Sequence, residues 1–352
     1  MSDKLVQKLI EIYQKAKQDL VKTIAEKEAI GNLVTYQKSL LFQVNQILSE
    51  LTSQAYNLTN EIVESYYKDT IDEVLQDLKD KGEQIQATGF SKLHTGAIAV
   101  IAKNFFQDLQ DANNFVGRQI SDAIRKAGLD AVSQKIATGQ TVQECKKNLV
   151  NMLIDQGFNG IKDKRGRMIS LDAYASTVAR STTTETTNTA TTNQLTELGY
   201  DLVQMTEHSP TCAICALYQG RVYSISGKDT RFPSLSVAFN GEFANIHPNC
   251  AHRLFPYIES LADNFDKDIE FSNRPFELSE KDKKVLETYN NQQKEKIKLR
   301  NDRDQWQRYK LAMPQDTPKN FASFRRNKNL NNNKYQNLLS SYRSLRQGGE
   351  GD

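Results

Sequence analysis

Apolar residues recur at three- and four-residue steps over most of this 352-residue chain, the spacing of one face of an α-helix. In 3–30 the apolar stripe consists of Leu5, Leu9, Ile12, Ala16, Leu20 and Ile24. A second helix is expected over 33–80, ended by Lys81-Gly82, and further helices over 91–126, ended by Gly128. We interpret these segments as a bundle that buries its own apolar stripe, with a partner-binding arm as the alternative.

Two further helices are indicated by different signals. Thr141 to Glu144 has the form of a capping box and predicts a helix to about residue 156, with Cys145 as a buried or idle thiol in its first turn. The stretch 171–198 is rich in threonine, which disfavours an isolated helix. Because its apolar residues still fit a helix face and Gly199 fits a stop, we expect a helix held by tertiary packing.

Strands are predicted in the middle of the chain. Residues 160–169 predict a small hairpin or tight loop, and strands are expected over 199–205, 220–227 and 253–258, the last ended by Pro256. The fold class is therefore α+β: a largely helical N-terminal region, a small β-rich domain and a charged helical tail. The corresponding domains are 1–160, 161–262 and 263–352.

The tail differs from the rest of the chain in charge. The whole chain has a formal charge of +3, but residues 272–352 hold 18 Lys and Arg against 10 Asp and Glu. A long charged helix is expected over 280–312, broken by Pro314 and Pro318. Over 321–346 aromatic and basic residues alternate, a pattern that contacts phosphates and stacks on bases, or that belongs to a solvated helix docked on a partner.

The cysteines point to a reducing compartment. Four cysteines are too few for a disulfide scaffold, and Cys145 stands apart from the other three. The N-terminus has no apolar signal region, and the longest apolar run, Ala97–Ala102, is far short of a membrane span. We therefore expect a soluble protein made in the cytoplasm, with no membrane partner.

A metal site is predicted within 201–258, which holds three of the four cysteines and three of the four histidines. Cys212 and Cys215 form a C-x-x-C pair, and His247, Cys250 and His252 form H-x-x-C-x-H. Thiolate-rich tetrahedral sites favour zinc, so we expect one structural zinc per chain.

The fourth ligand of that zinc is left open by the spacing. Pro248 holds His247 extended and could aim it inward, whereas His252 in a strand would share the face of Cys250. The fourth histidine, His94, stands apart and is interpreted as a surface or capping residue. With three cysteines and a histidine available, a closed structural site is the default over a catalytic one.

The central stretch resembles a known family. Tyr200, His208, Cys212, Cys215, the run Tyr218–Gly227, Phe232-Pro233, Asn249-Cys250-Ala251-His252 and Pro256 are similar to the phage minor capsid protein 2 family, with a dense match over 171–260. Arg180-Ser181-Thr182 and Asn188 fit that family's arginine–threonine helix. The ending H-P-N-C-A-H departs from the H-P-N-C-R-C of related head-morphogenesis proteins.

The resemblance implies a minor structural protein of a tailed-bacteriophage head. It implies action in head morphogenesis at the portal vertex or inside the head, with the portal, the major capsid or scaffold proteins as partners and packaged double-stranded DNA contacted by the basic tail. It brings no established enzymatic activity. Two alternatives remain: a metal- or histidine-dependent nuclease or toxin-like module using His208, Arg180, Glu185 or His252, and a zinc-stabilised DNA-binding protein.

Overall fold

The protein is mostly helical, with two small antiparallel sheets. The computed structural model describes residues 2–28, 32–85, 90–138, 145–146, 149–150, 160–162, 168–239 and 244–347. The chain forms two compact units, each assembled from separate stretches: 1–12, 52–111 and 172–291 in the first, and 13–51, 112–171 and 292–352 in the second. Within the described segments, no helix has the combination of length and apolarity that crossing a bilayer requires.

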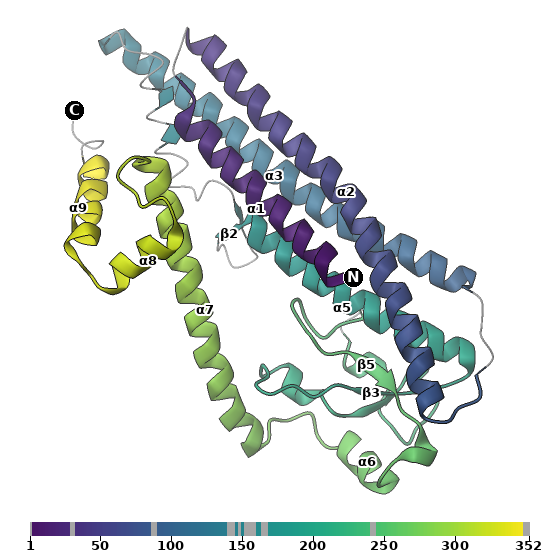
Figure 1. The fold of residues 1–352 in the computed structure, drawn as a ribbon. Helices are drawn as coiled ribbons and strands as arrows, with labels where there is room; N and C mark the ends of the chain where they lie inside the picture. Colours follow the sequence, from purple (N-terminus) through teal and green to yellow (C-terminus); the bar gives the residue numbers. More distant parts are fainter. Residues whose placement is uncertain are drawn as a thin grey trace. The chain divides into compact units, whose positions relative to one another are not determined.

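The helices agree closely with the apolar periodicity (Figure 1). Their bounds are α1 Ser2–Glu26, α2 Leu33–Asp80, α3 Lys92–Thr138, α5 Leu171–Leu198, α6 Phe265–Ser272, α7 Glu280–Ala312, α8 Phe321–Asn329 and α9 Asn333–Gln347. The predicted ends at Gly82 and Gly199 are confirmed, since both residues have positive φ and close the helices that precede them. No helix was predicted at the position of α6.

The predicted strands are confirmed as short elements. β1 (Gly160–Lys162) pairs with β2 (Met168–Ser170), the predicted hairpin. β3 (Leu202–Met205) is the central strand of the second sheet, between β4 (Val222–Ser224) and β5 (Leu254–Pro256), and both pairings are antiparallel. Because β4 and β5 flank β3, the connection that leaves Met205 and the segment that enters Leu254 lie at the same end of the sheet.

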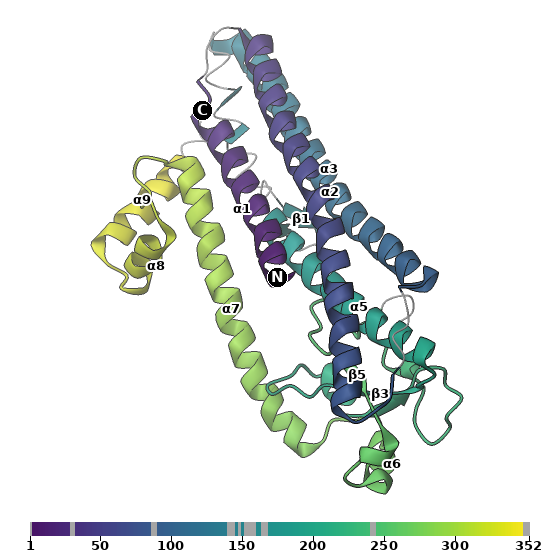
Figure 2. The ribbon, with the colours of Figure 1, turned by 45° about the vertical axis from the view of Figure 1, so that its right-hand side comes forward.

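Both faces of this sheet are buried. On one face, Val203, Tyr223 and Leu254 pack with Val74 and Leu78 of α2 and with Leu195 of α5. On the other face, Leu202 and Val222 pack with Phe232, Tyr257 and two residues of α6. Figure 2 shows α5 running beside β3 and β5. The sheet is therefore an inner layer of its unit, and its stability depends on helices distant in sequence.

The threonine-rich helix α5 satisfies much of its own polarity. Hydroxyls of Thr177, Thr186, Thr191, Thr192 and Thr196 each donate to the backbone carbonyl four residues earlier. These bonds allow threonines to be buried on a helix without orphaned hydroxyl groups. Ala190 packs with Tyr67 and Ile71 of α2. The prediction of a helix held by tertiary packing is confirmed.

In the second unit, α2 and α3 approach closely, and one prediction fails there. Helix α3 continues through Gly128 to Thr138 and does not end at Gly128. A Cβ at Gly128 would lie 1.9 Å from Nε2 of Gln37, which donates to the carbonyl of Ile124 at 2.8 Å. The glycine is thus explained by the close approach of a side chain and not by a helix end.

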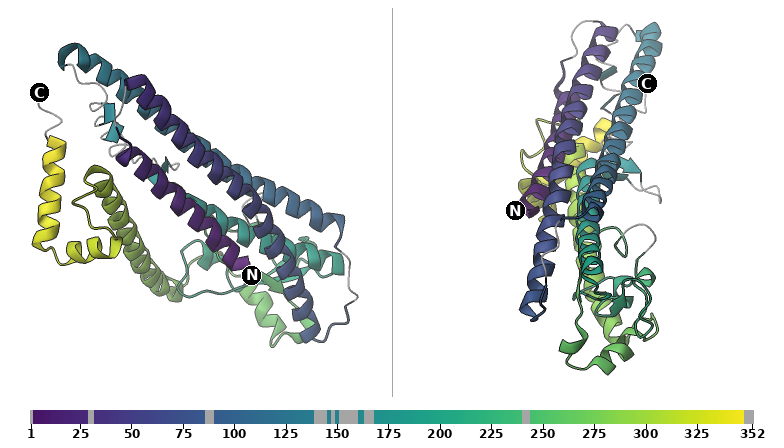
Figure 3. Two further views of the ribbon diagram at one scale, coloured as in Figure 1. Left: turned by 45° about the horizontal axis from the view of Figure 1, so that its top comes forward. Right: turned by 90° about the vertical axis from the view of Figure 1, so that its right-hand side faces the viewer.

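The C-terminal helices form a small module with its own core (Figure 3). Its buried residues are Tyr309 and Met313 near the end of α7, Phe324 of α8, and Tyr335 and Leu338 of α9. The aromatic residues of the tail pack against one another; for example, the rings of Tyr309 and Phe324 lie 5.9 Å apart, edge to face. Phe324 and Tyr335 are core residues and are not available to stack on nucleic-acid bases, whereas Phe321 and Tyr342 are only partly buried.

A buried carboxylate organises the polar part of the same module. Asp302 is 2% exposed and accepts from Nζ of Lys328 at 2.6 Å. Lys328 also donates to Gln305, whose amide donates to the hydroxyls of Tyr309 and Tyr335. One tail lysine is therefore used inside the module.

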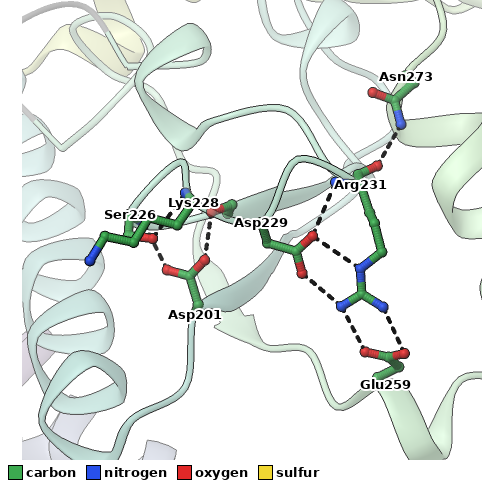
Figure 4. A network of polar contacts seen from close by, with 8 residues as sticks. Asp201, Ser226, Lys228, Asp229, Arg231, Glu259 and Asn273 are labelled. Carbon is green, nitrogen blue, oxygen red and sulfur yellow. Dashed lines mark hydrogen bonds and ion pairs between the residues drawn. The ribbon is translucent and has the colours of Figure 1, made fainter.

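The loop after β4 is fixed by acidic side chains (Figure 4). Asp201 accepts from the hydroxyl of Ser224 at 2.6 Å and from the backbone N–H of Ser226 at 2.8 Å. Farther along, Arg231 bridges Asp229 and Glu259 with paired hydrogen bonds. These contacts hold the turn at the end of the sheet opposite to the cysteines.

His94 is not on the surface, contrary to its interpretation from the sequence. It is 1% exposed, with Nδ1 3.1 Å from the hydroxyl of Tyr67 and Nε2 2.9 Å from Oε2 of Glu197. Asn193 also donates to the hydroxyl of Tyr67. A histidine alone in the sequence is here part of a buried polar network that joins α2, α3 and α5.

Some expectations fall on segments outside the described residues. The predicted helix 141–156 is described only at 145–146 and 149–150, and the basic turn 163–167 of the hairpin lies outside the described residues altogether. Cys145 is buried, and burial raises the pKa of its thiol to about 11, as expected for an idle cysteine. The domain boundaries at 160 and 262 remain a prediction.

Glu185 on α5 carries the most perturbed carboxyl pKa of the first unit. Burial, followed by the charge of Asp108 on α3, raises the pKa of Glu185 from 4.5 to about 7. The pKa of Asp108 is also raised, by burial and by Asp111. Because the pKa of Glu185 is higher in the folded than in the unfolded chain, folding stability is lost as pH rises from about 4.5 through about 7.

We therefore predict that Glu185→Gln stabilises the protein in a pH-dependent way. Its melting temperature should exceed that of the wild type by a margin that grows between about pH 5 and about pH 8, because glutamine cannot ionise. Thermal melts across this pH range measure the margin. Glu61→Gln, an exposed position on α2, is the control and should show no such growth. A constant difference at every pH would contradict the assignment.

Candidate metal centre

The five predicted ligand residues come from two segments that the sheet brings together. Cys212 and Cys215 lie in the β3–β4 connection, where Cys215 begins a short 3-10 turn, η1 (Cys215–Leu217). His247, Cys250 and His252 lie in the segment that leads into β5. Since β3 pairs with both β4 and β5, these segments meet at the Met205 end of the sheet.

The H-P-N-C sequence forms a turn whose first and last residues, His247 and Cys250, both belong to the candidate metal site. The backbone N–H of Cys250 donates to the carbonyl of His247 at 3.0 Å. Pro248 occupies the second position of this turn, and Asn249 occupies the third with φ of 64°. Proline and a residue tolerant of positive φ are the favoured choices at these positions. The motif is therefore explained by backbone geometry as well as by ligand chemistry.

The ligand atoms form two overlapping groups that share Cys215. Nε2 of His247 lies 3.2 Å from Sγ of Cys212 and 3.0 Å from Sγ of Cys215. Sγ of Cys250 lies 3.8 Å from Sγ of Cys215 and 3.5 Å from Nδ1 of His252. Within each group of three, all ligand atoms are within 4.8 Å of one another.

Hydrogen bonds fix the tautomers of both imidazoles. Nδ1 of His247 is 2.7 Å from the carbonyl of Pro248, so Nδ1 carries a proton and Nε2 is the nitrogen that faces the sulfurs, where a metal would displace its proton. Nε2 of His252 is 3.0 Å from Oε1 of Gln219, which also accepts from the backbone N–H of His208 at 3.1 Å. The lone pair of Nδ1 of His252 therefore faces Cys250. Both rings have the form that a metal ligand requires.

The electrostatics of the cluster favour a cation. The hydrogen bond with Cys215, then that with His247, lowers the pKa of Cys212 to about 3 despite its partial burial. Cys250 is shifted in the same direction, first by its hydrogen bond with Cys215, while the pKa of Cys215 between these two sulfurs is strongly raised. The hydrogen bond to Cys212 raises the pKa of His247 to about 9. The sulfurs of Cys212 and Cys250 are thus anionic, and they flank the protonated sulfur of Cys215.

The geometry and chemistry of the cluster fit a tetrahedral, sulfur-rich metal site. Ligand atoms of one zinc ion lie about 3.5 to 4 Å apart when zinc–sulfur bonds are about 2.3 Å. The Cys215–Cys250 and Cys250–His252 separations have this size. Cys215, Cys250 and His252 are buried, whereas Cys212 and His247 are half-buried. Five donors are available for four positions.

The residues considered for an enzymatic site are only partly brought together. The ring of His208 lies 4.6 Å from that of His252, but its Nε2 faces Thr206 and the carbonyl of Ala251. Arg180 is exposed, and no hydrogen bond or ion pair joins it to Glu185 among the described residues. These four side chains therefore do not converge on one reacting centre.

The sequence indicated Ser181 and Asn188 only through the family resemblance and gave them no role, and it did not indicate Thr184 as a support of the cluster. Ser181, Thr184 and Asn188 of α5 bond to the backbone of the segment that carries His247, Cys250 and His252. Their spacing of three and four residues places them on one helix face, which was the available signal. Gln219 was also missed, because nothing in its sequence position indicates that it orients His252.

Comparison with known proteins gives a family and one relative. The family described as phage minor capsid protein 2 matches residues 2–339, nearly the whole chain. A curated relative, named "Structural protein" and from Lactococcus phage LL-H, is 28% identical over 158 residues. That match covers 43% of this chain and 41% of the relative, so less than half of the relative's length is spanned. No solved structure matches significantly.

Proposed function

The chain belongs to the phage minor capsid protein 2 family, and we propose that it acts in head morphogenesis at or near the portal, with one structural zinc ion in its sheet domain. The single observation that carries the zinc assignment is the convergence of three thiols and two imidazoles from two segments. The family and the phage structural relative support a virion component assembled with other capsid proteins.

The helical surface supports a role in assembly. Val34 and Phe42 of α2 are 57% and 69% exposed, although both are large apolar residues. Such residues on a surface are typical of contacts with other proteins when they occur together. We propose that the portal, the major capsid protein or the scaffold covers such positions during assembly in the host cytoplasm, and that the protein resides in the head interior or at the portal vertex.

The zinc would be structural because the available ligands can close its coordination. Three cysteines and one histidine fill four tetrahedral positions, leaving none for substrate or activated water. The thiolate-rich donor set favours zinc over magnesium or calcium, which prefer oxygen ligands. His208, Arg180 and Glu185 do not join the cluster in a way that supports the nuclease or toxin-like alternative.

We predict that purified full-length protein contains one zinc per chain and that Cys250→Ser removes it. Loss of a structural zinc should lower the melting temperature by roughly 10 °C or more. Elemental analysis and thermal melts measure the two effects. Cys145→Ala is the matched control, because Cys145 is buried outside the cluster and its replacement should retain the metal.

Two outcomes would count against the zinc centre. The first is wild-type protein, purified without chelators, that contains no metal. All four of its thiols would then react with a thiol reagent after denaturation, without added chelator. The second is a Cys250→Ser variant that retains both full metal content and the wild-type melting temperature. Either outcome would leave the family membership intact. The sheet would then be stabilised by its apolar core and not by a metal ion.

We propose His247 as the fourth ligand beside Cys212, Cys215 and Cys250. Its Nε2 is within 3.2 Å of the sulfurs of Cys212 and Cys215, whereas His252 lies 3.5 Å from the sulfur of Cys250 and within 4.8 Å of that of Cys215. His252 would then pack beside Cys250, with its orientation set by Gln219. The half-buried position of His247 places it at the rim of the site, where a ligand can close coordination last.

His247→Ala should accordingly weaken zinc binding more than His252→Ala. We expect about 100-fold or more for the loss of a ligand and about tenfold for the loss of a neighbour. Competition with a chromophoric chelator measures both affinities. Cobalt substitution gives an independent reading, because the absorption of thiolate-bound cobalt reports a change in the ligand set. A larger loss in His252→Ala would assign His252 as the ligand instead.

The basic tail supports contact with packaged double-stranded DNA through phosphates alone. Arg326, Lys334 and Arg343 have exposed side chains on α8 and α9. Phe324 and Tyr335 are in the module core, and Phe321 and Tyr342 are partly buried against it. Binding through charge without base contacts is independent of sequence and depends strongly on salt.

We predict that Arg326→Glu, Lys334→Glu and Arg343→Glu together weaken low-salt binding of the full-length protein to duplex DNA. If the three residues contact phosphates, the slope of log affinity against log salt should fall by roughly 3. Lys4→Glu, Lys8→Glu and Lys103→Glu change the net charge equally at exposed positions elsewhere and serve as the control. Equal effects of the two triple variants would reject a tail-specific contact, and no wild-type binding at low salt would reject any.

A further inference from the structure

A row of polar side chains on α5 lies against the segment that carries three of the candidate ligands. Oγ of Ser181 accepts from the backbone N–H of Asn249 at 3.0 Å. The hydroxyl of Thr184 donates to the carbonyl of Cys250 at 2.8 Å. One turn later, Asn188 contacts the same segment. These three side chains differ from those of Thr186, Thr191 and Thr192, whose hydroxyls bond within their own helix.

Asn188 uses both ends of its amide. Its Nδ2 donates to the carbonyl of Ala244 at 2.7 Å and to that of His252 at 3.3 Å. Its Oδ1 accepts from the backbone N–H of Leu254 at 3.0 Å. The side chain is 1% exposed. One amide thus satisfies three backbone groups on both sides of the turn that presents His247 and Cys250.

These contacts replace a missing strand partner. The segment from Ala244 to Arg253 is irregular, and its buried backbone groups need partners that a sheet would otherwise supply. Backbone bonding to the end of β3 resumes only at Arg253, whose carbonyl accepts from the N–H of Thr206, just before β5 begins at Leu254. Asn188 bonds both at the start of the segment and at the first residue of β5. Asn188 therefore holds the two ends of the segment, Ala244 and Leu254, close to one side chain.

We propose that Asn188 is a positioning residue that holds 244–254 in its ligand-presenting conformation before any metal binds. Ser181 and Thr184 add one bond each to the same segment. The effect of Asn188 on metal affinity rests on the zinc centre proposed above, but its effect on the backbone does not. The site is then formed by the protein and filled by the ion, whereas in a zinc finger the ion itself drives folding.

The first experiment measures the backbone without metal. Full-length protein treated with chelator is compared by amide hydrogen exchange, with peptides covering 244–256. Asn188→Ala should accelerate exchange in this segment at least about tenfold, because the bonds to Ala244, His252 and Leu254 are lost. Thr192→Ala is the control one turn away, since its hydroxyl bonds only to carbonyls of its own helix, and it should leave the segment unchanged.

The second experiment measures metal affinity with zinc and cobalt. Asn188→Ala should weaken binding about 10- to 100-fold, as for other residues that orient ligands. Asn188→Asp keeps the acceptor for Leu254 but loses both donors, so it should be no better than alanine. Thr192→Ala should bind as the wild type does, which separates positioning from a general loss of helix stability.

The outcomes separate this inference from the zinc centre itself. Unchanged exchange of 244–256 in chelated Asn188→Ala overturns the positioning role, whether or not the protein binds metal. A chelated wild type whose segment exchanges as fast as an unfolded chain overturns it as well. Wild-type protein that binds neither ion sinks the zinc centre but leaves the exchange result to decide on Asn188. A lower melting temperature with unchanged affinity and exchange would mean a merely structural role.

Discussion

Burying a helix as polar as α5 imposes the constraint on which the first unit depends. Each buried hydroxyl or amide needs a partner, because an unsatisfied one costs about 1 to 3 kcal/mol. Most threonines of α5 find that partner in their own helix. Asn188 and Asn193 find it elsewhere, in the ligand segment and in Tyr67. The helix is stable only where the sheet, the ligand segment and α2 are all in place.

This dependence makes the fold of the unit cooperative across large sequence separations. The sheet has three short strands, which would be marginal alone in water. It is buried between α2 and α5 on one face and α6 on the other. The chain must therefore bring α2 and the residues after 200 together before either is satisfied. A metal at the open end of the sheet would fasten an arrangement that the helices already specify.

The sequence was sufficient where the physical signal was local. Helices 33–80 and 280–312 were predicted at their observed bounds, the first from its apolar spacing and the glycine after it, the second from its charged composition and the prolines that follow it. The meeting of Cys212 and Cys215 with His247, Cys250 and His252 was also predicted, from ligand type and spacing. The order of ligands around the ion could not be, since it depends on which carbonyl or amide fixes each imidazole.

Contacts between distant residues account for the errors. His94 was read as a surface residue because Tyr67 and Glu197, its partners, lie 27 and 103 positions away. Stacking on bases stayed open for the tail aromatics because alternation with basic residues does not reveal that Phe324 and Tyr335 are enclosed between α7, α8 and α9. In each case the residue types were read correctly, but whether their side chains are buried or exposed depends on the tertiary packing.

Gly128 shows how such packing restricts the history of the sequence. Any side chain there would displace Gln37, and the carbonyl of Ile124 would lose its amide donor. Shortening Gln37 alone would open a gap beside a glycine that cannot fill it. Because the displaced atoms are the far end of a flexible side chain, the main loss from a change at 128 is the hydrogen bond to Ile124, so the choice of residue at 128 is coupled to that at 37 on a different helix.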